Sequence, residues 1–386
     1  MSLDTVYLIV AILAAGFWLI AGMLLCVKRD ALVCLKAISI DDSVTFPKIS
    51  IIIPARNEEQ NIRPALQSVL ALDYPHLEIC VVNDRSTDGT GSILQEMSQQ
   101  DVRLQVQQID TLPQGWLGKT HALHQAGQNA TGEFLLFTDA DIVYHPLALR
   151  KAMHYVQRHQ LDHMTMIPED TMPGTFLHII SATFGMFMFL LFQPWKTSDP
   201  RSRRYMGIGA FNLVRASVYH GIGGHEAIRL RPDDDLKFGK VIKRCGYRQE
   251  VLNGIGMVSV EWYRSVSELI DGLMKNMFAG MEYRVSLVIL ATMGTLLIHL
   301  WPWVGLWLTT GLPQALLLIT VFTMISSFVY GMAPYGVKPW HGLLLPVTIS
   351  LFLYIQWRAT FLTLWNSGIT WRGTRYSLND LKANRV

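Results

Sequence analysis

The sequence has few charged residues and few cysteines, and each shortage excludes a class of protein. Charged side chains make up 16% of the 386 residues and hydrophobic ones 50%, a balance that wholly soluble proteins seldom have. The four cysteines (Cys26, Cys34, Cys80, Cys245) form no CxxC pair, so neither a disulfide framework nor a zinc site is indicated. The formal net charge of +3 is too small to indicate a nucleic-acid partner. A P-loop is also excluded, because Pro113 stands where that motif requires its first glycine before the GKT at 118–120.

The charges are concentrated in one part of the chain. Residues 8–27 and most of 286–365 nearly lack them, whereas residues 28–174 have the composition of a soluble domain. The chain is long enough for one catalytic domain and several membrane spans. We therefore expect a multi-pass protein of the cell membrane, taken as a bacterial inner membrane, with one soluble domain.

The first apolar segment is predicted to be a retained transmembrane anchor, residues 1–28. Residues 5–27 carry no charge and exceed the roughly 20 residues needed to cross the hydrocarbon layer. Asp4 precedes them, whereas a cleaved signal peptide begins with basic residues. Lys28, Arg29 and Lys36 follow, so the positive-inside rule places the next domain in the cytoplasm.

Residues 286–366 contain about three more candidate spans, at 286–308, 312–333 and 342–365. Three crossings would place the basic tail, residues 367–386, outside the cell. Arg372, Arg375, Lys382 and Arg385 in that tail favour the inside. The sequence leaves this conflict open, and one re-entrant or interfacial segment would remove it.

Residues 175–195 are also long and apolar enough to span. Hydropathy alone does not distinguish a helix that crosses the membrane from one that lies in the interface. Acidic motifs flank the segment at 139–141 and 233–235, and a crossing would separate them by the membrane. Since we expect the two motifs to share one site, we predict a helix that lies in the cytoplasmic interface.

Three short runs predict buried strands of an α/β domain with a mainly parallel sheet: KISIIIP (48–54), EICVVN (78–83) and EFLLFT (133–138). Each leads into a polar motif, respectively RNEE (56–59), DRSTDGT (84–90) and DAD (139–141). Ligands of such domains bind at the carboxyl ends of the strands. The repeated placement of polar motifs at strand ends therefore predicts a binding site there.

Asp139 and Asp141 are the candidate metal ligands. They alternate with Ala140 just past a strand, so both carboxylates can approach one hard cation, Mn²⁺ or Mg²⁺, that bridges a diphosphate. The alternative is a solvated turn with a helix-capping aspartate. Asp84 is predicted to accept hydrogen bonds from a base edge, whereas Asp88 resembles the N-cap of the next helix. Lys119 is predicted to meet a phosphate or base oxygen at a helix start, unless it is simply solvated.

Together these motifs resemble family 2 glycosyltransferases with the GT-A fold. IIIPARNEE, VVNDRSTDGT, LGKTHAL, FTDAD and the pair Asp234-Asp235 ahead of Gly246-Tyr247 follow that family's order and spacing over about residues 47–285. The resemblance implies a cytoplasmic catalytic domain that inverts the anomeric centre of the transferred sugar. It implies a nucleotide-sugar pocket lined by Pro54, Ala55, Arg56, Glu58, Asp84, Lys119 and Asp139, with Asp139 and Asp141 as the metal motif.

The same resemblance implies a general base. The family has a Glu-Asp pair twelve residues ahead of Gly-Tyr or Gly-Trp, which corresponds to Asp234 and Asp235 here and leaves Asp233 outside. Asp235 is the predicted base, with Asp234 as the alternative. An acidic N-cap cluster for a helix that begins near Leu236 is the structural alternative.

Within the family, the chain resembles the lipid-modifying branch: ceramide glucosyltransferases and the carotenoid- and hopanoid-associated enzymes. The tail TWRGTRY (370–376) is similar to the carotenoid type. The Gln/Arg-x-x-Arg-Trp motif of polysaccharide synthases, which ceramide glucosyltransferases also carry, is replaced by MKNMFAG (274–280), and this departure disfavours polymer synthesis. Lys275 is a candidate for the missing positive charge, unless it snorkels to the membrane surface.

We therefore expect transfer of one hexose from a UDP-sugar, with UDP-glucose as the first candidate, to a membrane lipid or isoprenoid. An alternative acceptor is a polyprenyl phosphate, held by the basic loop of Arg201, Arg203 and Arg204, which would equally suit anionic lipid headgroups. A non-catalytic membrane scaffold is the alternative of a different class.

Overall fold

The computed structural model describes residues 2–41 and 45–386, and the chain divides into two compact units. The α/β unit comprises Leu32–Thr171, Pro194–Trp262 and Thr370–Val386. The helical unit comprises Met1–Ala31, Met172–Gln193 and Tyr263–Ile369. In this division the tail belongs with the α/β unit, whereas residues 263–285 belong with the apolar helices.

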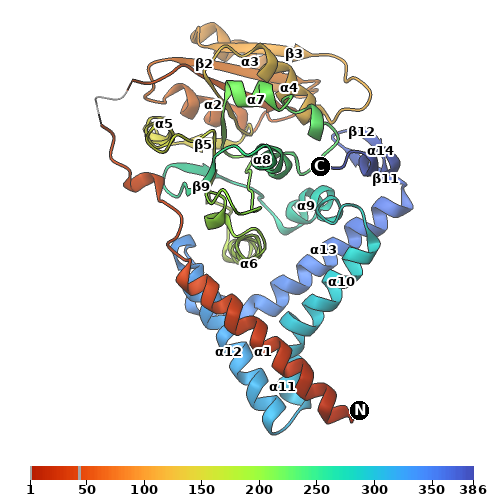
Figure 1. Ribbon diagram of the computed structural model, residues 1–386. Helices are drawn as coiled ribbons and strands as arrows, with labels where there is room; N and C mark the ends of the chain where they lie inside the picture. The colour runs from red at the N-terminus through yellow and green to blue at the C-terminus, as the bar shows by residue number, and fades with distance from the viewer. Residues whose placement is uncertain (1, 42–44) are drawn as a thin grey trace. The chain divides into compact units, whose positions relative to one another are not determined.

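The α/β unit is built on a seven-stranded sheet with the order β3-β2-β1-β4-β8-β6-β9 (Figure 1). Its strands are β1 (Ile49–Ala55), β2 (Leu77–Asp84), β3 (Leu104–Ile109), β4 (Phe134–Phe137), β6 (His163–Ile167), β8 (Asn212–Arg215) and β9 (Gln249–Asn253). Only β8 runs antiparallel to its two neighbours, β4 and β6. The predicted mainly parallel sheet is therefore confirmed.

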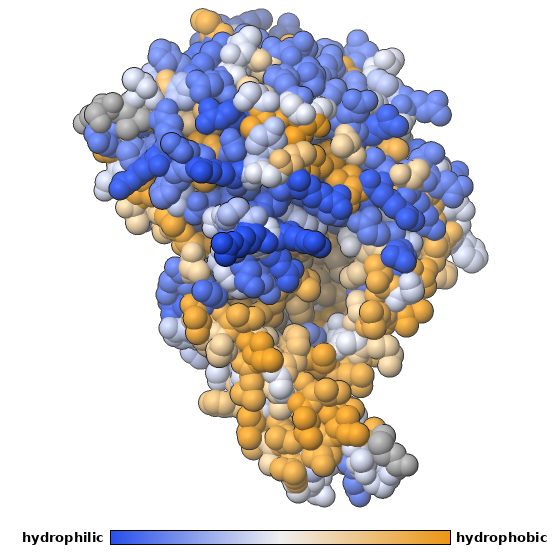
Figure 2. Space-filling view, in the orientation of Figure 1, coloured by the Kyte–Doolittle hydropathy of each residue, from blue (hydrophilic) through white to orange (hydrophobic). Residues whose placement is uncertain are grey.

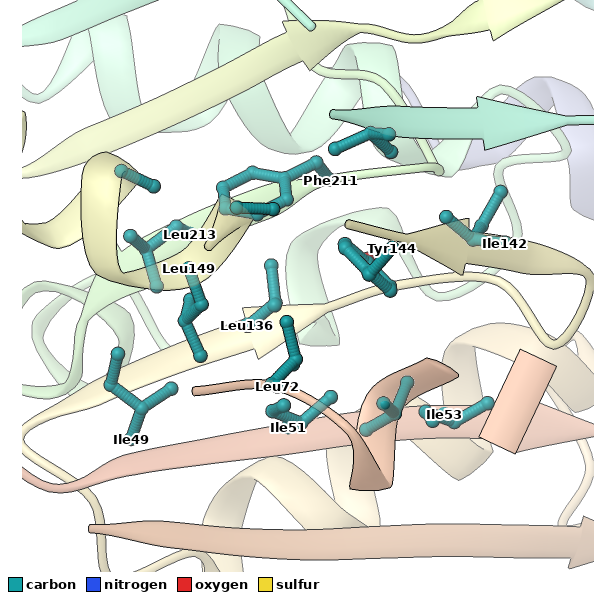
Figure 3. Packing of buried hydrophobic residues seen from close by; sticks show 14 of the residues in the cluster. Ile49, Ile51, Ile53, Leu72, Leu136, Ile142, Tyr144, Leu149, Phe211 and Leu213 are labelled. Carbon is teal, nitrogen blue, oxygen red and sulfur yellow. The ribbon is translucent and has the colours of Figure 1, made fainter. Parts of the chain in front are cut away.

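Helices cover both faces of this sheet. Alternate residues of each strand point to opposite faces, so apolar residues of the strands contribute to a cluster on each side. On one face Ile49, Ile51 and Ile53 pack in a large apolar cluster with side chains of α2, α3 and α5 (Figure 3). On the other face Ile52 and Val82 join a second cluster with α4, α7 and α8. These helices are α2 (Ile62–Leu70), α3 (Thr90–Gln100), α4 (Gly118–Asn129), α5 (Ala148–His159), α7 (Ala216–Gly221) and α8 (Asp234–Arg244).

Smaller elements complete the α/β unit. A three-stranded sheet has the order β5-β10-β7. Its strands are β5 (Ile142–Tyr144), β7 (Glu169–Asp170) and β10 (Val258–Val260). The tail folds as a hairpin, β11 (Gly368–Trp371) and β12 (Thr374–Ser377), followed by α14 (Leu378–Ala383). Short 3₁₀ turns are η1 (Leu35–Ala37), η2 (Pro194–Lys196) and η3 (Glu226–Ile228).

Among the residues that the structure describes, five helices are long and apolar enough to cross a membrane, judged by length and composition: Leu3–Val27, Thr175–Lys196, Val285–Leu308, Leu312–Gly331 and Pro339–Trp365. All of them lie in the helical unit except for residues 194–196 at the end of the second. Orange, hydrophobic residues dominate the visible surface of this unit (Figure 2). Its elements are α1 (Leu3–Val27), α6 (Thr175–Phe192), α9 (Val266–Gly280), α10 (Val285–Thr295), a π-helical turn (Leu296–Leu300), α11 (Trp301–Leu308), α12 (Leu312–Gly331), η5 (Ala333–Tyr335), η6 (Pro339–Leu344) and α13 (Leu345–Trp365).

Close packing and a few polar contacts hold the helical unit together. Gly22 of α1 lies against Ser327 of α12, where a Cβ atom would come 3.2 Å from the serine Cβ, so the small residue permits the two helices to approach. Trp18 donates through Nε1 to the carbonyl of Ile298, 3.1 Å away, in the π-helical turn. That turn precedes Pro302, which has no N–H for the helical ladder, so the irregularity has an identifiable cause.

Candidate active site

The parallel register brings the predicted polar residues to one edge of the sheet. Pro54 pairs with Val82 and Ala55 with Asn83, while Ile52 pairs with Phe137 on the other side of β1. The segments that follow β1, β2 and β4 therefore start at the same edge. Arg56, Asp84 and Asp139 are the polar residues at these three strand ends.

Asp84 is the buried acidic centre of the predicted nucleotide pocket, with 3% of its surface exposed. Arg85 donates to both carboxylate oxygens of Asp84, at 2.7 and 3.0 Å, and the Arg56 guanidinium lies 3.6 Å away. Gly118, the first residue of α4, packs against the same carboxylate so closely that a Cβ atom there would collide with it. The start of α4 and the end of β2 thus meet around one carboxylate.

Lys119 connects the two acidic motifs. Its Nζ lies 2.6 Å from Asp139 Oδ1 and 3.6 Å from Asp234 Oδ2. Burial alone would lower the pKa of Lys119, but the negative charges of Asp139, Asp234 and Asp235 outweigh that effect and hold the pKa above its ordinary value. The lysine is therefore a fixed cation between motifs that are far apart in the sequence.

Asp141 has a partly buried carboxylate of the kind that can bind a metal ion. Its Oδ1 is buried and makes no hydrogen bond. Burial, followed by the negative charges of Asp139 and Glu58, raises the pKa of Asp141 to about 7. A cation beside this carboxylate would offset both effects, and carboxylate oxygens are the ligands that Mg²⁺ and Mn²⁺ prefer. Asp139 and Asp141 thus fit a divalent cation.

The three consecutive aspartates at the start of α8 differ in their surroundings. Asp233 accepts two hydrogen bonds from the buried Arg231, at 2.8 and 2.9 Å, and it is not among the residues that line the pocket described below. Asp234 faces Lys119, as described above. Asp235 accepts from the backbone N–H of Gly209 at 2.8 Å and from that of Leu236 at 2.7 Å.

The environment of Asp235 raises the pKa of its carboxyl group. Burial and the nearby Asp139 raise its pKa, although Lys119 and the two backbone N–H groups act in the opposite direction. A carboxyl group with a raised pKa is better suited to accept a proton near neutral pH than an ordinary surface aspartate. The two oxygens are held by main-chain groups, so the carboxylate has a defined orientation.

A small pocket joins these groups. Its lining consists of Lys119, Leu123, Phe137, Thr138, Asp139, Gly209, Asn212, His225, Asp234, Asp235 and Phe238. The sequence analysis did not identify Gly209, Asn212 or His225. His225 stacks on Phe238 at 4.9 Å, and its Nδ1 lies 3.0 Å from the Tyr219 hydroxyl. Burial and the positive charges of His124 and Lys119 lower the pKa of His225 to about 3, so it is neutral.

Other predicted residues lie outside this pocket. Arg201, Arg203 and Arg204 are exposed in the segment between η2 and β8. Lys275 lies in α9 of the helical unit. Asp88 accepts from the N–H groups of Thr90 and Glu59, so it braces the start of α3.

Two local predictions were wrong by one or two residues. The N-cap of α3 is Gly89, which follows Asp88. Helix α8 begins at Asp234 and has Asp233 as its N-cap, so the acidic cluster does stand at the helix start, as in the structural alternative, but two residues earlier than the expected start near Leu236. Acidic residues in a first turn are favoured by the helix dipole, which explains how the helix can include them.

Several known proteins are similar to this chain. The family model for glycosyl transferase family 2 matches residues 50–216. A 4,4'-diaponeurosporenoate glycosyltransferase from Staphylococcus haemolyticus is 25% identical over 270 residues, which cover 69% of this chain and 70% of the relative. The protein of that name from Staphylococcus aureus (strain USA300) is 25% identical over 238 residues, or 60% and 61% of the two chains.

A solved structure shares the fold. It is a mannosyltransferase from Pyrobaculum calidifontis in complex with GDP-Man and Mn²⁺, with a TM-score of 0.56 and 18% identity. The similarity covers 93% of this chain and 99% of that one. The α/β unit accordingly has a GT-A-like fold. The chain is therefore a glycosyltransferase, and its residues 50–216 match the model of glycosyl transferase family 2.

Proposed function

We propose that the enzyme transfers one hexose from a UDP-sugar to an apolar lipid or isoprenoid in a single inverting displacement. The observation that carries this proposal is the position of Lys119, which is ion-paired with Asp139 and lies 3.6 Å from Asp234. Lys119 lies in one pocket with Asp139 of the proposed metal motif and with Asp234 and Asp235 of the proposed base-bearing helix. A donor and an acceptor can therefore meet beside both.

Each group has a role that its surroundings support. Asp139 and Asp141 would hold Mn²⁺ or Mg²⁺, which when bound stabilises the negative charge that grows on the departing nucleoside diphosphate. Lys119 is placed to pair with that diphosphate. Asp84 and Arg56, at the ends of β2 and β1, are proposed to bind the nucleoside. Asp235 would remove the proton from an acceptor hydroxyl as it attacks.

The acceptor is proposed from the relatives and from composition. Two relatives are named for a carotenoid-type acid, and this chain includes five helices apolar enough to lie in a membrane, where such acceptors dissolve. A polyprenyl phosphate is a second candidate, supported by the exposed Arg201, Arg203 and Arg204.

Product analysis tests the donor and acceptor together. Membranes containing the enzyme are incubated with radiolabelled UDP-glucose or GDP-mannose and with a carotenoid acid, a carotenoid alcohol or a polyprenyl phosphate. We expect label from UDP-glucose in a carotenoid product, released by alkali if an ester has formed. Label only in an acid-labile polyprenyl phosphate product would replace the proposed acceptor, and label from GDP-mannose alone would replace the proposed donor. No lipid-linked label from any combination would favour the scaffold alternative.

We further infer that α6 lies in the membrane interface and does not cross. The support is that β6 precedes α6 in the chain, β8 follows it, and the two strands pair, with His163 opposite Val214. A single crossing between them would place paired strands on opposite sides of a membrane. The same reasoning applies to the tail, because Arg372 donates to Glu58 at 2.7 Å within the α/β unit.

The chain must then cross the membrane an even number of times between Trp262 and Thr370. Of the three apolar segments in this interval, we propose that α10–α11 and α12 cross and that α13 is interfacial. Only α13 contains a charged residue, Arg358, which pairs with Asp271 of α9 at 2.9 Å. Ionised side chains are rare in membrane-spanning segments. This arrangement removes the conflict between three crossings and a basic tail.

Cysteine labelling tests the topology. In a background without the four native cysteines, single cysteines at Ser86, Ser198 and Lys382 should react with an impermeant maleimide from one side, the cytoplasmic one. A cysteine at Thr310, between α11 and α12, should react from the other side. The readout is the labelled fraction in right-side-out and inverted vesicles. Labelling of Ser86 and Ser198 from opposite sides would contradict the interfacial α6, and labelling of Lys382 with Thr310 would contradict the interfacial α13.

A further inference from the structure

The C-terminal tail reaches the proposed nucleotide pocket. Residues 370–386 belong to the α/β unit but lie well beyond the part of the chain that matches the family, 50–216. They contact the segments that follow β1 and β2 and the start of α4. These segments carry Arg56, Glu58 and Asp84, which we propose to line the donor site.

The tip of the tail hairpin holds the β1–α2 loop. Arg372 and Gly373 both have positive φ values, 47° and 78°, as in the two-residue turns that join tightly twisted strands. From this turn the Arg372 guanidinium donates to the carbonyl oxygen of Arg56 and to Glu58 Oε1, the latter at 2.7 Å. One side chain thus fixes both the main chain and an acidic side chain of the loop.

The following strand contacts the other two segments. Thr374 Oγ1 lies 3.5 Å from Arg85 Nη1, and Arg85 is the partner of Asp84. Tyr376 is buried, which raises the pKa of its phenol overall, and its hydroxyl lies close enough to the backbone of Gly118 for that backbone to lower the pKa in part. The strand therefore lies where the end of β2 meets the start of α4.

Beyond the hairpin, α14 anchors the tail to the α/β unit. Leu381 is fully buried, with 0% of its surface exposed. Asn384 accepts from the N–H of Leu230 and donates to the carbonyl of Ala227, both at 3.0 Å. The hairpin is thus attached by its own contacts and by a helix that packs independently of them.

We propose that the tail hairpin is part of the donor site and that Arg372 is a positioning residue for the nucleoside diphosphate. This inference rests on the proposed function. Arg372 holds Glu58 and the Arg56 carbonyl in place before the donor arrives, and Arg56 in turn lies 3.6 Å from Asp84. A loop that is already ordered loses less conformational freedom when a ligand binds, so the tail increases donor affinity.

Nucleotide binding to the purified full-length enzyme in detergent tests this inference. The probe is UDP with Mn²⁺, measured by calorimetry, together with the donor KM and kcat. Arg372→Ala should raise the Kd for UDP and the donor KM about tenfold, which corresponds to ~1.4 kcal/mol, with kcat changed less than about twofold. Arg372→Lys keeps the charge but not the planar fork that reaches two acceptors, so an intermediate Kd is expected. Lys382→Ala, which removes an exposed tail cation, is the matched control and should leave all three values unchanged.

Three results would overturn the inference in distinguishable ways. Equal UDP affinity in the wild type and Arg372→Ala would exclude the positioning role while leaving the proposed donor intact. A fall in kcat with an unchanged donor KM would assign Arg372 to another step. Failure of the wild type to bind UDP would overturn the proposed donor and this inference together. If Arg372→Ala unfolds, wild-type protein decides: UDP with Mn²⁺ should slow tryptic cleavage at Arg372 and Arg375, and an unchanged rate would exclude a role for the hairpin in binding.

Discussion

Asp235→Asn should lower kcat for transfer to a hydroxyl acceptor about 10²- to 10⁴-fold, the usual contribution of a general base. This loss corresponds to roughly 3 kcal/mol or more of transition-state stabilisation. Asparagine keeps the shape of the side chain, and its single carbonyl oxygen can still accept from one of the two N–H groups, that of Gly209 or that of Leu236, but it cannot take up a proton at neutral pH. The Kd for UDP should therefore change little. Steady-state kinetics and calorimetry on the same preparation measure both values.

Two variants complete this experiment. Asp110→Asn makes the same substitution at an exposed residue that directly follows β3 and should leave activity and melting temperature unchanged. Asp234→Asn removes a neighbour of Lys119 and is expected to weaken donor binding more than Asp235→Asn does. Near-wild-type transfer by Asp235→Asn together with loss in Asp234→Asn would move the base by one residue.

The functional group of the acceptor sets the size of this effect. An alcohol must lose its proton as it attacks, whereas a carboxylic acid is already ionised at neutral pH. The loss in Asp235→Asn should therefore be large with a carotenoid alcohol and much smaller with a carotenoid acid. A loss of equal size with both acceptors would indicate that Asp235 has a role other than proton removal.

Removal of divalent cations should abolish transfer, and Asp141→Asn should reproduce that loss in the presence of Mn²⁺. A cation at Asp139 and Asp141 would stabilise charge on the leaving group by several kcal/mol, so we expect at least ~10²-fold lower kcat. Donor hydrolysis in the absence of acceptor should fall in parallel, because both reactions release the same nucleoside diphosphate. Transfer and hydrolysis assays with and without chelator provide the measurement.

Restoration experiments make this prediction specific. Adding Mn²⁺ or Mg²⁺ in excess of the chelator should restore the wild type but not Asp141→Asn. Asp110→Asn again serves as the control for the substitution itself. Full activity of the wild type in excess chelator would contradict the metal assignment, as would normal Mn²⁺-dependent activity of Asp141→Asn.

The strands that were predictable from the sequence are those built around an uninterrupted run of apolar residues. KISIIIP, EICVVN and EFLLFT correspond to β1, β2 and β4 with ends shifted by no more than one residue, because such runs form buried parallel strands wherever they pack. Strand β3 was missed. It reads LQVQQI and lies at the edge of the sheet, where most of its residues face solvent and polar side chains are tolerated. It forms a strand because it pairs with β2, and a local sequence pattern does not reveal that pairing.

The candidate site was predictable to the extent that residue type reveals chemistry. Aspartates at strand ends identified Asp84, Asp139 and Asp141, since carboxylates are conspicuous next to apolar runs. The contribution of Gly209 depends on the space it leaves beside Asp139, where a Cβ atom would collide with the carboxylate. His225 lines the pocket through the packing of three aromatic neighbours. Neither position has a signal in the one-dimensional pattern, because both depend on contacts between distant segments.

The order of strands in the large sheet has a consequence for the evolution of such enzymes. The strands that lead into the proposed donor residues, β1, β2 and β4, are contiguous in the sheet and complete by residue 141. Everything that follows β8, including α8 and the helices of residues 263–369, is encoded downstream. Mutation or recombination in the second half of the gene, upstream of the tail hairpin, can therefore alter the proposed acceptor site while the strands of the donor site and the hairpin are inherited intact. Lineages that glycosylate different lipids should diverge most in this second half.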